Sequence, residues 1–288
     1  MALVKKANDL IKANYNLSKN EQRLILYLLS TIQRPDKDFK EYEFSFTDLV
    51  EIVGMRHATV YTELKSIAHS LLSNPICFQE EVDVLDYYNW CSRFKINNQN
   101  KTISLSFHPG IKPYLLQLKA NFTTYHLKYV SGFSSAHSFR IYEICKQYQK
   151  MKKRKLSIYE LKDILDIADK YSQISALKAY VIKPAIKDIN EHSDLLIKVQ
   201  YYKTKRSITD IEFIISNKLE SCKNEKQQEI IIEEVKSVKK KQAEKKEITE
   251  KSSEKLKIWN SLSDEEKEKK YGTGPMAYGN FRASFSKV

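Results

Sequence analysis

Residues 157–215 have the sequence SIYELKDILDIADKYSQISALKAYVIKPAIKDINEHSDLLIKVQYYKTKRSITDIEFII, and this stretch decides the fold class. Ser157 stands three residues before Glu160, a capping pattern in which side-chain oxygens satisfy free N–H groups at the start of a helix. The short helix predicted there leads through a polar turn at residues 169–173 to a longer helix that should end near His192.

A predicted hairpin follows the longer helix. Apolar and polar residues alternate over residues 195–201 and again over 211–215, which is the pattern of half-buried strands. The tip between them, residues 203–206, reads Lys-Thr-Lys-Arg. A short helix, a turn, a longer helix and a basic hairpin in this order predict a winged helix-turn-helix. In that fold the longer helix enters the major groove of DNA, and the hairpin, or wing, lies on the backbone beside it.

The longer helix divides into two faces. Apolar residues recur every four positions and should pack against the preceding helix at 159–168: Leu177, Val181, Ala185 and Ile189. The opposite face would approach bases and phosphates, and it carries Gln173, Ser175, Lys178, Ala179, Ile182 and Lys183. Pro184 removes the hydrogen bond to Tyr180 and costs about 3 kcal/mol inside a helix, so we expect a kink or a break there.

The same order of elements occurs earlier in the chain, which indicates a duplicated architecture. The predicted elements of this part are a capped helix from Ser18 to before Pro35, a strand at 41–46, a short helix at 47–53 stopped by Gly54, a longer helix ended by Asn74-Pro75, and strands at 76–81, 87–96 and 102–107. A connecting helix at 108–118 and further helices within 122–149 should lead into the second part.

Positive charge is concentrated in the second predicted domain. The formal net charge of the chain is +13. Residues 112–206 hold 19 Lys and Arg against 8 Asp and Glu, whereas residues 1–111 hold 13 of each kind. A phosphate-binding surface needs such a local excess, and a diffuse solubilising charge is the alternative interpretation.

From Lys218 onward the sequence is charged and poor in apolar residues, which predicts a largely helical or disordered tail. Its exceptions are an apolar patch and an aromatic end: Ile230, Ile231, Ile232, Val235, Trp259, Leu262, Tyr271, Tyr278, Phe281 and Phe285. These side chains are expected either to dock on the folded body or a partner, or to belong to a tail that only solubilises the chain.

Composition favours a cytoplasmic protein without membrane contact. No apolar run reaches about 18 residues, and no charged-then-apolar leader is present. The four cysteines lie far apart without a C-x-x-C pair and are expected to be reduced, mostly core residues: Cys77, Cys91, Cys145 and Cys222.

Catalytic patterns are missing, so we predict no enzyme activity, no metal and no cofactor. Rolling-circle replication enzymes need two histidines separated by one residue, plus a tyrosine nucleophile. No such pair exists among His57, His69, His108, His126, His137 and His192. The six glycines form neither G-x-x-x-x-G-K-[ST] nor G-x-G-x-x-G, which argues against an ATPase or a helicase.

The chain resembles the initiator replication proteins of iteron-controlled bacterial plasmids, which have two winged-helix domains. The resemblance covers about residues 3–216. It rests most on these segments: Phe122–Leu127, Ser138–Glu143 with Gln147-Tyr148, and Val181–Asn190 leading into the basic hairpin tip. The opening segments Val4–Leu10 and Leu17–Leu24 also match.

The resemblance implies an α+β protein of two tandem winged helix-turn-helix domains with a charged C-terminal extension. Residues 1–119 would form the first domain, for dimerisation and secondary DNA contact, residues 120–217 the main DNA-binding domain, and residues 218–288 the extension. It also implies a replication initiator that binds direct repeats, called iterons, in a plasmid origin as a monomer. A homodimer in equilibrium with the monomer would repress the protein's own promoter. The host replication initiator and the replicative helicase are the expected partners in the bacterial cytoplasm.

DNA-contacting residues follow from the resemblance by position. In the second domain they are Ser175, Lys178, Lys183, Lys203, Lys205 and Arg206, and in the first domain Arg56, His57, Thr59, Thr62 and Lys65. The polar face of the helix adds Gln173 to this set. Lysine binds as a point charge rather than as a bidentate fork. Base discrimination should therefore depend more on Gln173, Ser175 and DNA shape, which suits an A·T-rich origin.

Two other functions remain open. A transcriptional repressor without replication activity needs the same fold and charge. A winged-helix adaptor that contacts proteins predicts weak DNA binding without sequence preference.

Overall fold

The computed structural model describes residues 2–33, 36–81, 83–218, 254, 256–274 and 276–284. They belong to two compact units, Met1–Ser221 and Cys222–Val288. The apolar patch at Ile230, Ile231, Ile232 and Val235, together with Cys222 and Phe285, lies outside the described residues.

The second winged module runs from residue 153 to residue 217. Its elements are β8 (Lys153–Ser157), α7 (Ile158–Ile164), α8 (Ile174–Leu177), a π-helical segment (Lys178–Ile182), α9 (Lys183–His192), β9 (Leu195–Thr204) and β10 (Ser207–Asn217). The strands form one antiparallel sheet of order β8-β10-β9. Ser157 begins α7 as predicted, since its hydroxyl accepts a hydrogen bond from the backbone N–H of Glu160.

The first winged module repeats this topology. Its elements are β2 (Tyr42–Ser45), α3 (Phe46–Val53), α4 (Val60–Ser73), β5 (Cys91–Asn97) and β6 (Thr102–Phe107), and its sheet order is β2-β6-β5. Gly54 ends α3 in the left-handed conformation, with φ of 74°. In both modules the strand before the short helix pairs with the second strand of the wing. The predicted fold of two winged helix-turn-helix domains is confirmed.

Three predicted elements are wrong. The strand expected at 87–96 is two strands, because β4 (Val84–Tyr88) pairs with β3 (Ile76–Glu81) and β5 begins only after the buried Trp90. The connecting helix expected at 108–118 is a 3-10 turn and the single turn α5 (Lys112–Leu115). The first helix expected after residue 122 is the strand β7 (Phe122–His126).

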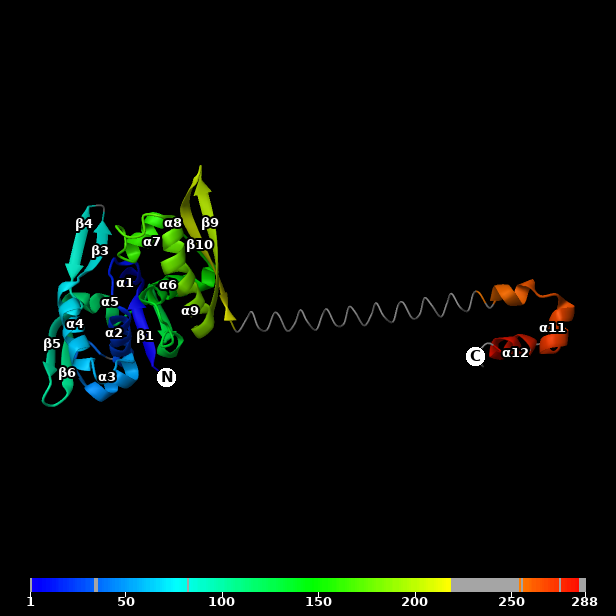
Figure 1. Ribbon diagram of the computed structural model, residues 1–288, viewed down its shortest axis with the longest axis horizontal. Coiled ribbons are helices and arrows are strands. Elements are labelled where there is room, and N and C mark those ends of the chain that lie inside the picture. The colour runs from blue at the N-terminus through cyan, green and yellow to red at the C-terminus, as the bar shows by residue number, and fades with distance from the viewer. Residues whose placement is uncertain are drawn as a thin grey trace. The chain divides into compact units, whose positions relative to one another are not determined.

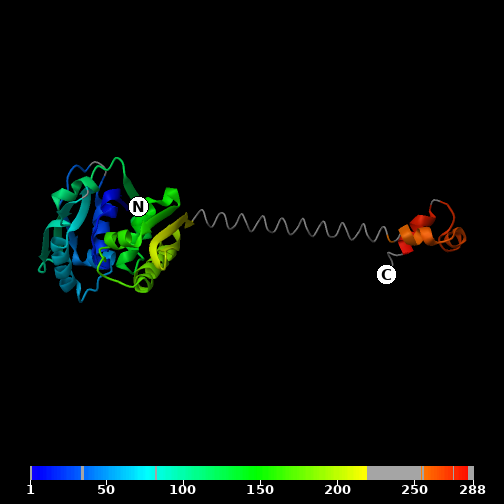
Figure 2. The same ribbon diagram turned by 90° about the horizontal axis from the view of Figure 1, so that it is seen from above.

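The central elements lie between the two winged modules (Figures 1 and 2). They are β1 (Leu3–Ala7), α1 (Asn8–Lys12), α2 (Lys19–Thr31), β7 and α6 (Ala136–Gln147). β1 pairs with β7 in antiparallel register, so Lys6 lies opposite Thr123. A strand from the start of the chain therefore helps to hold the middle of the chain in place.

A buried ion network lies among these central elements. The ammonium of Lys6 on β1 lies 2.8 Å from the carboxylate of Glu143 on α6, and both side chains are fully buried. Tyr125 on β7 donates a hydrogen bond to the same carboxylate. Burial, followed by the charge of Glu143, raises the pKa of Tyr125 well above its ordinary value, so the phenol remains a donor.

Arg140 connects this network to both modules. Its guanidinium donates hydrogen bonds to the carbonyl oxygens of Ala13 at 2.7 Å and Ile164 at 3.1 Å, the second at the end of α7. It also lies 3.6 Å from the ring centroid of Tyr15, which packs edge-on against Trp90 of the first module. The network therefore ties β1, α6, α7 and the first winged module together.

The C-terminal unit contains its own small aromatic core. A helix over residues 256–261, α11 (Asp264–Tyr271) and α12 (Ala277–Ser284) bring four rings together. The ring of Trp259 lies 5.3 Å from that of Tyr278 and 5.2 Å from that of Phe281, which is 1% exposed. Tyr271 packs edge-on against Phe281. In the described part of this unit, these aromatic residues pack against each other.

We predict that replacing Glu143 with glutamine lowers the free energy of unfolding by about 3–5 kcal/mol, because Lys6 and Arg140 would then be buried without a full counter-charge. Denaturant unfolding followed by circular dichroism measures this loss. The control is Glu41→Gln, which breaks the exposed pair with Arg93 and should change stability by less than about 1 kcal/mol. Equal effects of the two substitutions would contradict a structural role for the buried network.

Candidate nucleic-acid interface

The reading helix of the second module, α8 through α9, contains a π-helical turn that accounts for the spacing of its apolar residues, which recur every four positions. Residues four apart in an α-helix drift by about 40° per step, so an every-four repeat would rotate away from the core. The π-helical segment Lys178–Ile182 contains more residues per turn and reduces this drift. All four predicted core residues are consequently buried: Leu177, Val181, Ala185 and Ile189.

Pro184 lies where the π segment ends, at the second position of α9. A residue in the first turn of a helix needs no intrahelical acceptor for its N–H, so proline is tolerated there. The α-helical hydrogen-bond pattern is interrupted just before Pro184 by this π segment, while the backbone stays helical at Ile182 and Lys183.

Gln173, Ser175 and Lys183 are exposed on the open face of the reading helix, as the sequence predicts. Ile182 is not, since its side chain is only 1% exposed. Its assignment to the open face is wrong, because the π segment turns both Val181 and Ile182 toward the core.

Lys178 is half-buried and has a partner inside the protein. Its ammonium lies 3.7 Å from the ring centroid of Tyr201 on β9, in cation–π geometry. Burial raises the pKa of Tyr201, so this ring stays neutral beneath the cation. The contact joins the reading helix to the wing strand, and the sequence pattern did not reveal it.

The three basic residues of the wing tip, Lys203, Lys205 and Arg206, are all exposed. Lys205 has a φ of 58°, in the left-handed region that a tight turn between β9 and β10 uses. Figure 1 shows the wing tip and α8 at the same end of the second module. This arrangement presents cations beside the start of the reading helix.

The predicted contacts of the first module lie on and just before α4. Arg56 and His57 are exposed in the turn, and Thr62 and Lys65 are exposed on the helix. The Thr59 hydroxyl donates a 2.5 Å hydrogen bond to Glu63, so its nearest partner belongs to the helix itself.

These first-module residues do not join the second-module set in one cluster. Figure 1 shows α3 and the β5–β6 tip at the end of the unit opposite to the β9–β10 tip. The protein therefore offers two separate candidate contact areas.

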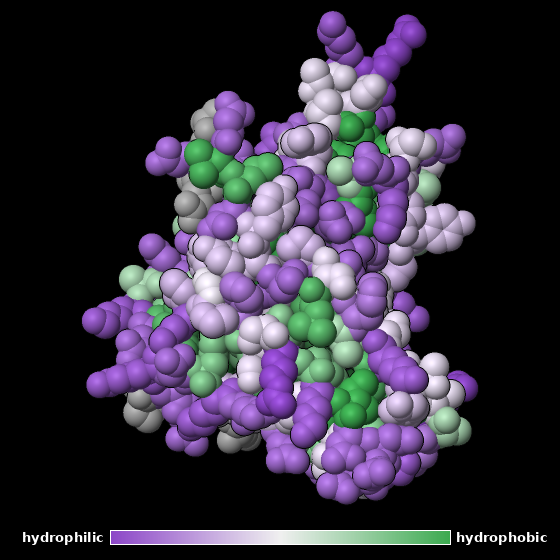
Figure 3. All heavy atoms as spheres, turned by 90° about the vertical axis from the view of Figure 1, so that its left-hand side faces the viewer, coloured by the Kyte–Doolittle hydropathy of each residue, from purple (hydrophilic) through white to green (hydrophobic). Residues whose placement is uncertain are grey.

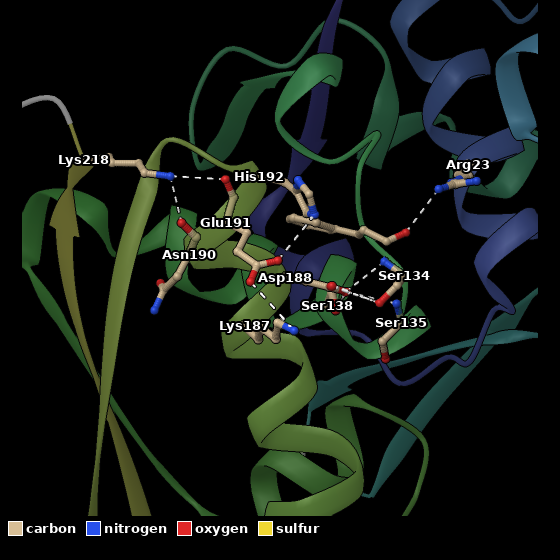
Figure 4. Close-up of polar contacts among 11 residues, drawn as sticks. Arg23, Ser134, Ser135, Ser138, Lys187, Asp188, Asn190, Glu191, His192 and Lys218 are labelled. Carbon is tan, nitrogen blue, oxygen red and sulfur yellow. Dashed lines mark hydrogen bonds and ion pairs between the residues drawn. The ribbon is translucent and has the colours of Figure 1, made fainter.

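Asp188 fixes the position of the reading helix, and sequence reasoning missed it. Its carboxylate accepts hydrogen bonds from the backbone N–H groups of Ser134 at 2.8 Å and Ser135 at 3.0 Å, and from the hydroxyl of Ser138 at 2.6 Å (Figure 4). These donors lie just before α6 and in its first turn, so Asp188 attaches α9 to the start of the central helix. The signal in the sequence was an acidic residue between the core positions Ala185 and Ile189.

Asn190 makes a second connection, from α9 to the wing. Its side-chain amide exchanges two hydrogen bonds with the backbone of Ile197 on β9, of 3.0 and 2.7 Å. Together with the Lys178–Tyr201 contact, it fixes the angle between the helix and the hairpin.

The ionisation of Asp188 follows from its partners. Burial alone would raise its pKa, but the hydrogen bonds from Ser138, Ser135 and Ser134 outweigh burial and lower the pKa below its ordinary value. The charged form is therefore the one that the fold stabilises.

Two family models match this geometry. The model described as "Initiator Replication protein, WH1" matches residues 3–146, and the model described as "Initiator Rep protein, WH2" matches residues 157–215. The chain belongs to this initiator replication protein family. The match confirms the resemblance seen in the sequence.

A relative and a solved structure agree with this assignment. The chain is 28% identical over 207 residues to a "Replication initiation protein" of Escherichia coli, an alignment that covers 68% of this chain and 65% of that relative. The chain thus spans just under two thirds of the relative's length. The structure of "Pi initiator protein in complex with iteron DNA" aligns with a TM-score of 0.60 at 19% identity, covering 75% of this chain and 98% of that one. This second likeness supports the fold.

Among the residues that the structure describes, no group of three or more His, Cys, Asp or Glu side chains is placed to hold a metal ion. No helix in the described ranges is long and apolar enough to cross a membrane. The three described cysteines, Cys77, Cys91 and Cys145, are free thiols, and burial raises the pKa of Cys91 to about 12.

We predict that Asp188→Asn lowers the free energy of unfolding by about 1–3 kcal/mol at pH 7, because the amide cannot accept all of these hydrogen bonds. A group with a lowered folded-state pKa contributes stability that is present at neutral pH and lost as pH falls. The gap between the two proteins should therefore narrow below about pH 4.

Unfolding curves at pH 3 and pH 7 measure the difference. The control is Asp169→Asn, in the exposed turn before α8, which should change stability by less than about 0.5 kcal/mol. An Asp188→Asn loss of the same size at both pH values would contradict the assigned role of the charge.

Proposed function

We propose that this protein is a plasmid replication initiator that binds direct repeats in a plasmid origin through its two winged modules. The observation that carries the proposal is the pairing of an open reading-helix face with an exposed basic wing tip, in a chain that both initiator family models match. The solved Pi initiator, which shares the fold, was crystallised with iteron DNA.

The two modules are assigned different shares of the binding. Residues 120–217 would provide most of the affinity for phosphates, because the excess of positive charge lies within 112–206. Residues 1–119 would add a weaker contact through the start of α4 and would carry the dimer interface. Residues 218–288 would form the charged C-terminal extension, most of which is a separate compact unit.

We further propose that a second copy of the chain docks on the β3–β4 hairpin and that the dimer represses the protein's own promoter. This two-stranded sheet exposes large apolar side chains on β4, since Val84 is 44%, Leu85 54% and Tyr87 55% exposed. Figure 3 looks onto the side of the molecule where small hydrophobic areas lie among hydrophilic side chains. An open sheet edge with apolar residues favours pairing with another strand.

The partners follow from the function. Duplex DNA of the origin and the operator is the ligand, and the host replication initiator and replicative helicase are the proteins that an initiator must recruit in the bacterial cytoplasm. The open reading face and the wing require no cofactor and no catalytic group for this role.

A transcriptional repressor without replication activity is the second candidate, since binding to an operator needs the same surfaces. A plasmid that carries only the origin repeats and this gene distinguishes the two. Replication of that plasmid supports the initiator, and repression of a reporter without replication supports the repressor.

The direct test is a titration of the full chain against duplexes that carry the direct repeats flanking its gene, and against scrambled duplexes of the same composition, at several salt concentrations. Specific binding should exceed nonspecific binding by about 10³-fold or more. Replacing Lys203, Lys205 and Arg206 with alanine should lower the salt slope of log K by about 2 to 3, because each cation releases about one counterion.

A matched control removes the same charge elsewhere. Lys257, Lys269 and Lys270 are exposed in the C-terminal unit, and their replacement with alanine should leave the salt slope unchanged. Equal salt slopes for the two triple variants would mean that DNA affinity depends on the net charge of the chain and not on the wing tip. Equal affinity for repeats and scrambled DNA would reject the proposed function and favour the adaptor.

We predict that Leu85→Asp shifts the protein toward the monomer, because a charge on β4 is costly to bury against a second copy. Sedimentation of the full chain over a range of concentrations measures the shift, and promoter repression should weaken with it. The control is Met151→Asp, another exposed apolar residue, located before β8. An unchanged dimer in Leu85→Asp would place the interface elsewhere.

A further inference from the structure

The open face of the reading helix has an apolar middle. Gln173 and Ser175 lie at its start and Lys183 at its end, and between them lie Ala176, Ala179 and Tyr180. The last three are spaced i, i+3 and i+4, so they share one side of the helix. We name Ala176, Ala179, Tyr180 and the neighbouring Tyr171 the apolar reading patch.

The π segment produces this exposure. In the wide turn two consecutive residues, Val181 and Ile182, face the core, and the two before them, Ala179 and Tyr180, face outward. π turns within α-helices are frequently found at functional sites. The turn therefore leaves an aromatic ring and a methyl group exposed on the part of the helix that the fold does not cover.

The ring of Tyr180 is exposed to solvent and contacts the ring of Tyr171 on one side. Its side chain is 69% exposed, and its ring lies 6.5 Å from that of Tyr171 with an interplanar angle of 27°. Tyr171 belongs to the loop before α8 and has a φ of 54°, so the loop is shaped to bring this ring beside the helix. The ring of Tyr180 is therefore accessible on the open face of the reading helix, next to the ring of Tyr171.

We propose that the apolar reading patch determines sequence specificity by packing on thymine methyl groups in the major groove. This inference rests on the proposed function and names the base feature that the second module reads. The thymine C5-methyl is the apolar group of the major groove, and alanine and aromatic side chains are suited to contact it. The helix has no arginine with which to read guanine by a bidentate pair.

The flanking residues fit this ligand. Gln173 supplies an amide of the kind that pairs with adenine, and Lys183 and the wing supply charge for phosphates. The patch therefore contributes selection for A·T pairs, while the cations contribute affinity that does not depend on sequence. A hydroxyl contact from Tyr180 to a phosphate is the competing role for the same residue.

The experiment replaces every thymidine of the flanking-repeat duplex with deoxyuridine, which removes only the methyl groups. The full-length wild type should bind the uridine duplex about three- to tenfold more weakly. Tyr180→Ala should bind the thymidine duplex more weakly than wild type and should lose most of the difference between the two duplexes. Tyr180→Phe keeps the ring and should keep the wild-type ratio.

Tyr159→Ala is the matched control, because Tyr159 is a tyrosine of the same module that is 78% exposed but lies on α7. Its thymidine-to-uridine ratio should equal that of wild type. Circular dichroism and melting curves show whether each variant keeps the fold, which is expected for exposed side chains. Any change of DNA shape caused by uridine remains in all variants and cancels in the comparison.

Three results would overturn the inference. The first is a wild-type ratio of one. The second is a Tyr180→Ala ratio equal to that of wild type. The third is a Tyr180→Phe variant that binds both duplexes as weakly as Tyr180→Ala does, which would assign the whole effect to a phosphate contact of the hydroxyl. Each of these leaves the proposed function intact if repeats still bind better than scrambled DNA. Loss of that preference in the wild type rejects the proposed function itself.

Discussion

The buried contact between Lys6 and Glu143 is the constraint on which the rest of the structure depends. A charge pair without solvent is stable only when further hydrogen bonds and cations surround it, and Tyr125 and Arg140 provide them. Because these four residues come from β1, β7 and α6, the pair can form only when the central elements are assembled. Arg140 then extends the contact to the end of α7 through Ile164. The position of each winged module is set by this polar centre as well as by apolar packing.

Polar contacts also fix the position of the reading helix in the second module. Asp188 binds the segment that starts α6, Asn190 binds the backbone of β9, and the Lys178 ammonium lies over the ring of Tyr201, so three polar contacts connect the helix to its surroundings. The open face is left with residues that have no such structural task, among them Gln173, Ser175 and Lys183. Precise placement of a helix against a groove requires rigid support of this kind. In a member of the initiator replication protein family, such support would hold the reading helix in position for DNA binding.

Local signals in the sequence predicted most elements and failed where the partner is remote. Ser157 and Gly54 mark helix ends by capping chemistry that acts within a few residues, and the alternation in the wing marks its strands. β7 was assigned to a helix although Phe, Thr and Tyr favour strands, and its pairing partner β1 lies at the start of the chain, where no local pattern connects the two. Ile182 was misplaced because a regular helical period cannot represent a π turn. The wing cations and the exposed polar residues of the reading helix could be predicted from charge, but Asp188 and Tyr201 act through three-dimensional contacts that no spacing rule reveals.

The pairing of β1 with β7 has a consequence for biosynthesis. During synthesis β1 leaves the ribosome long before its partner strand at residues 122–126. Glu143, the counter-charge of Lys6, emerges later still. Until then an unpaired strand and an uncompensated ammonium must remain hydrated, so the early half of the chain cannot complete its native packing on its own. Contacts of such long sequence separation also slow folding. The nascent chain is therefore incompletely folded, and open to chaperone binding and proteolysis, until the middle of the chain has emerged.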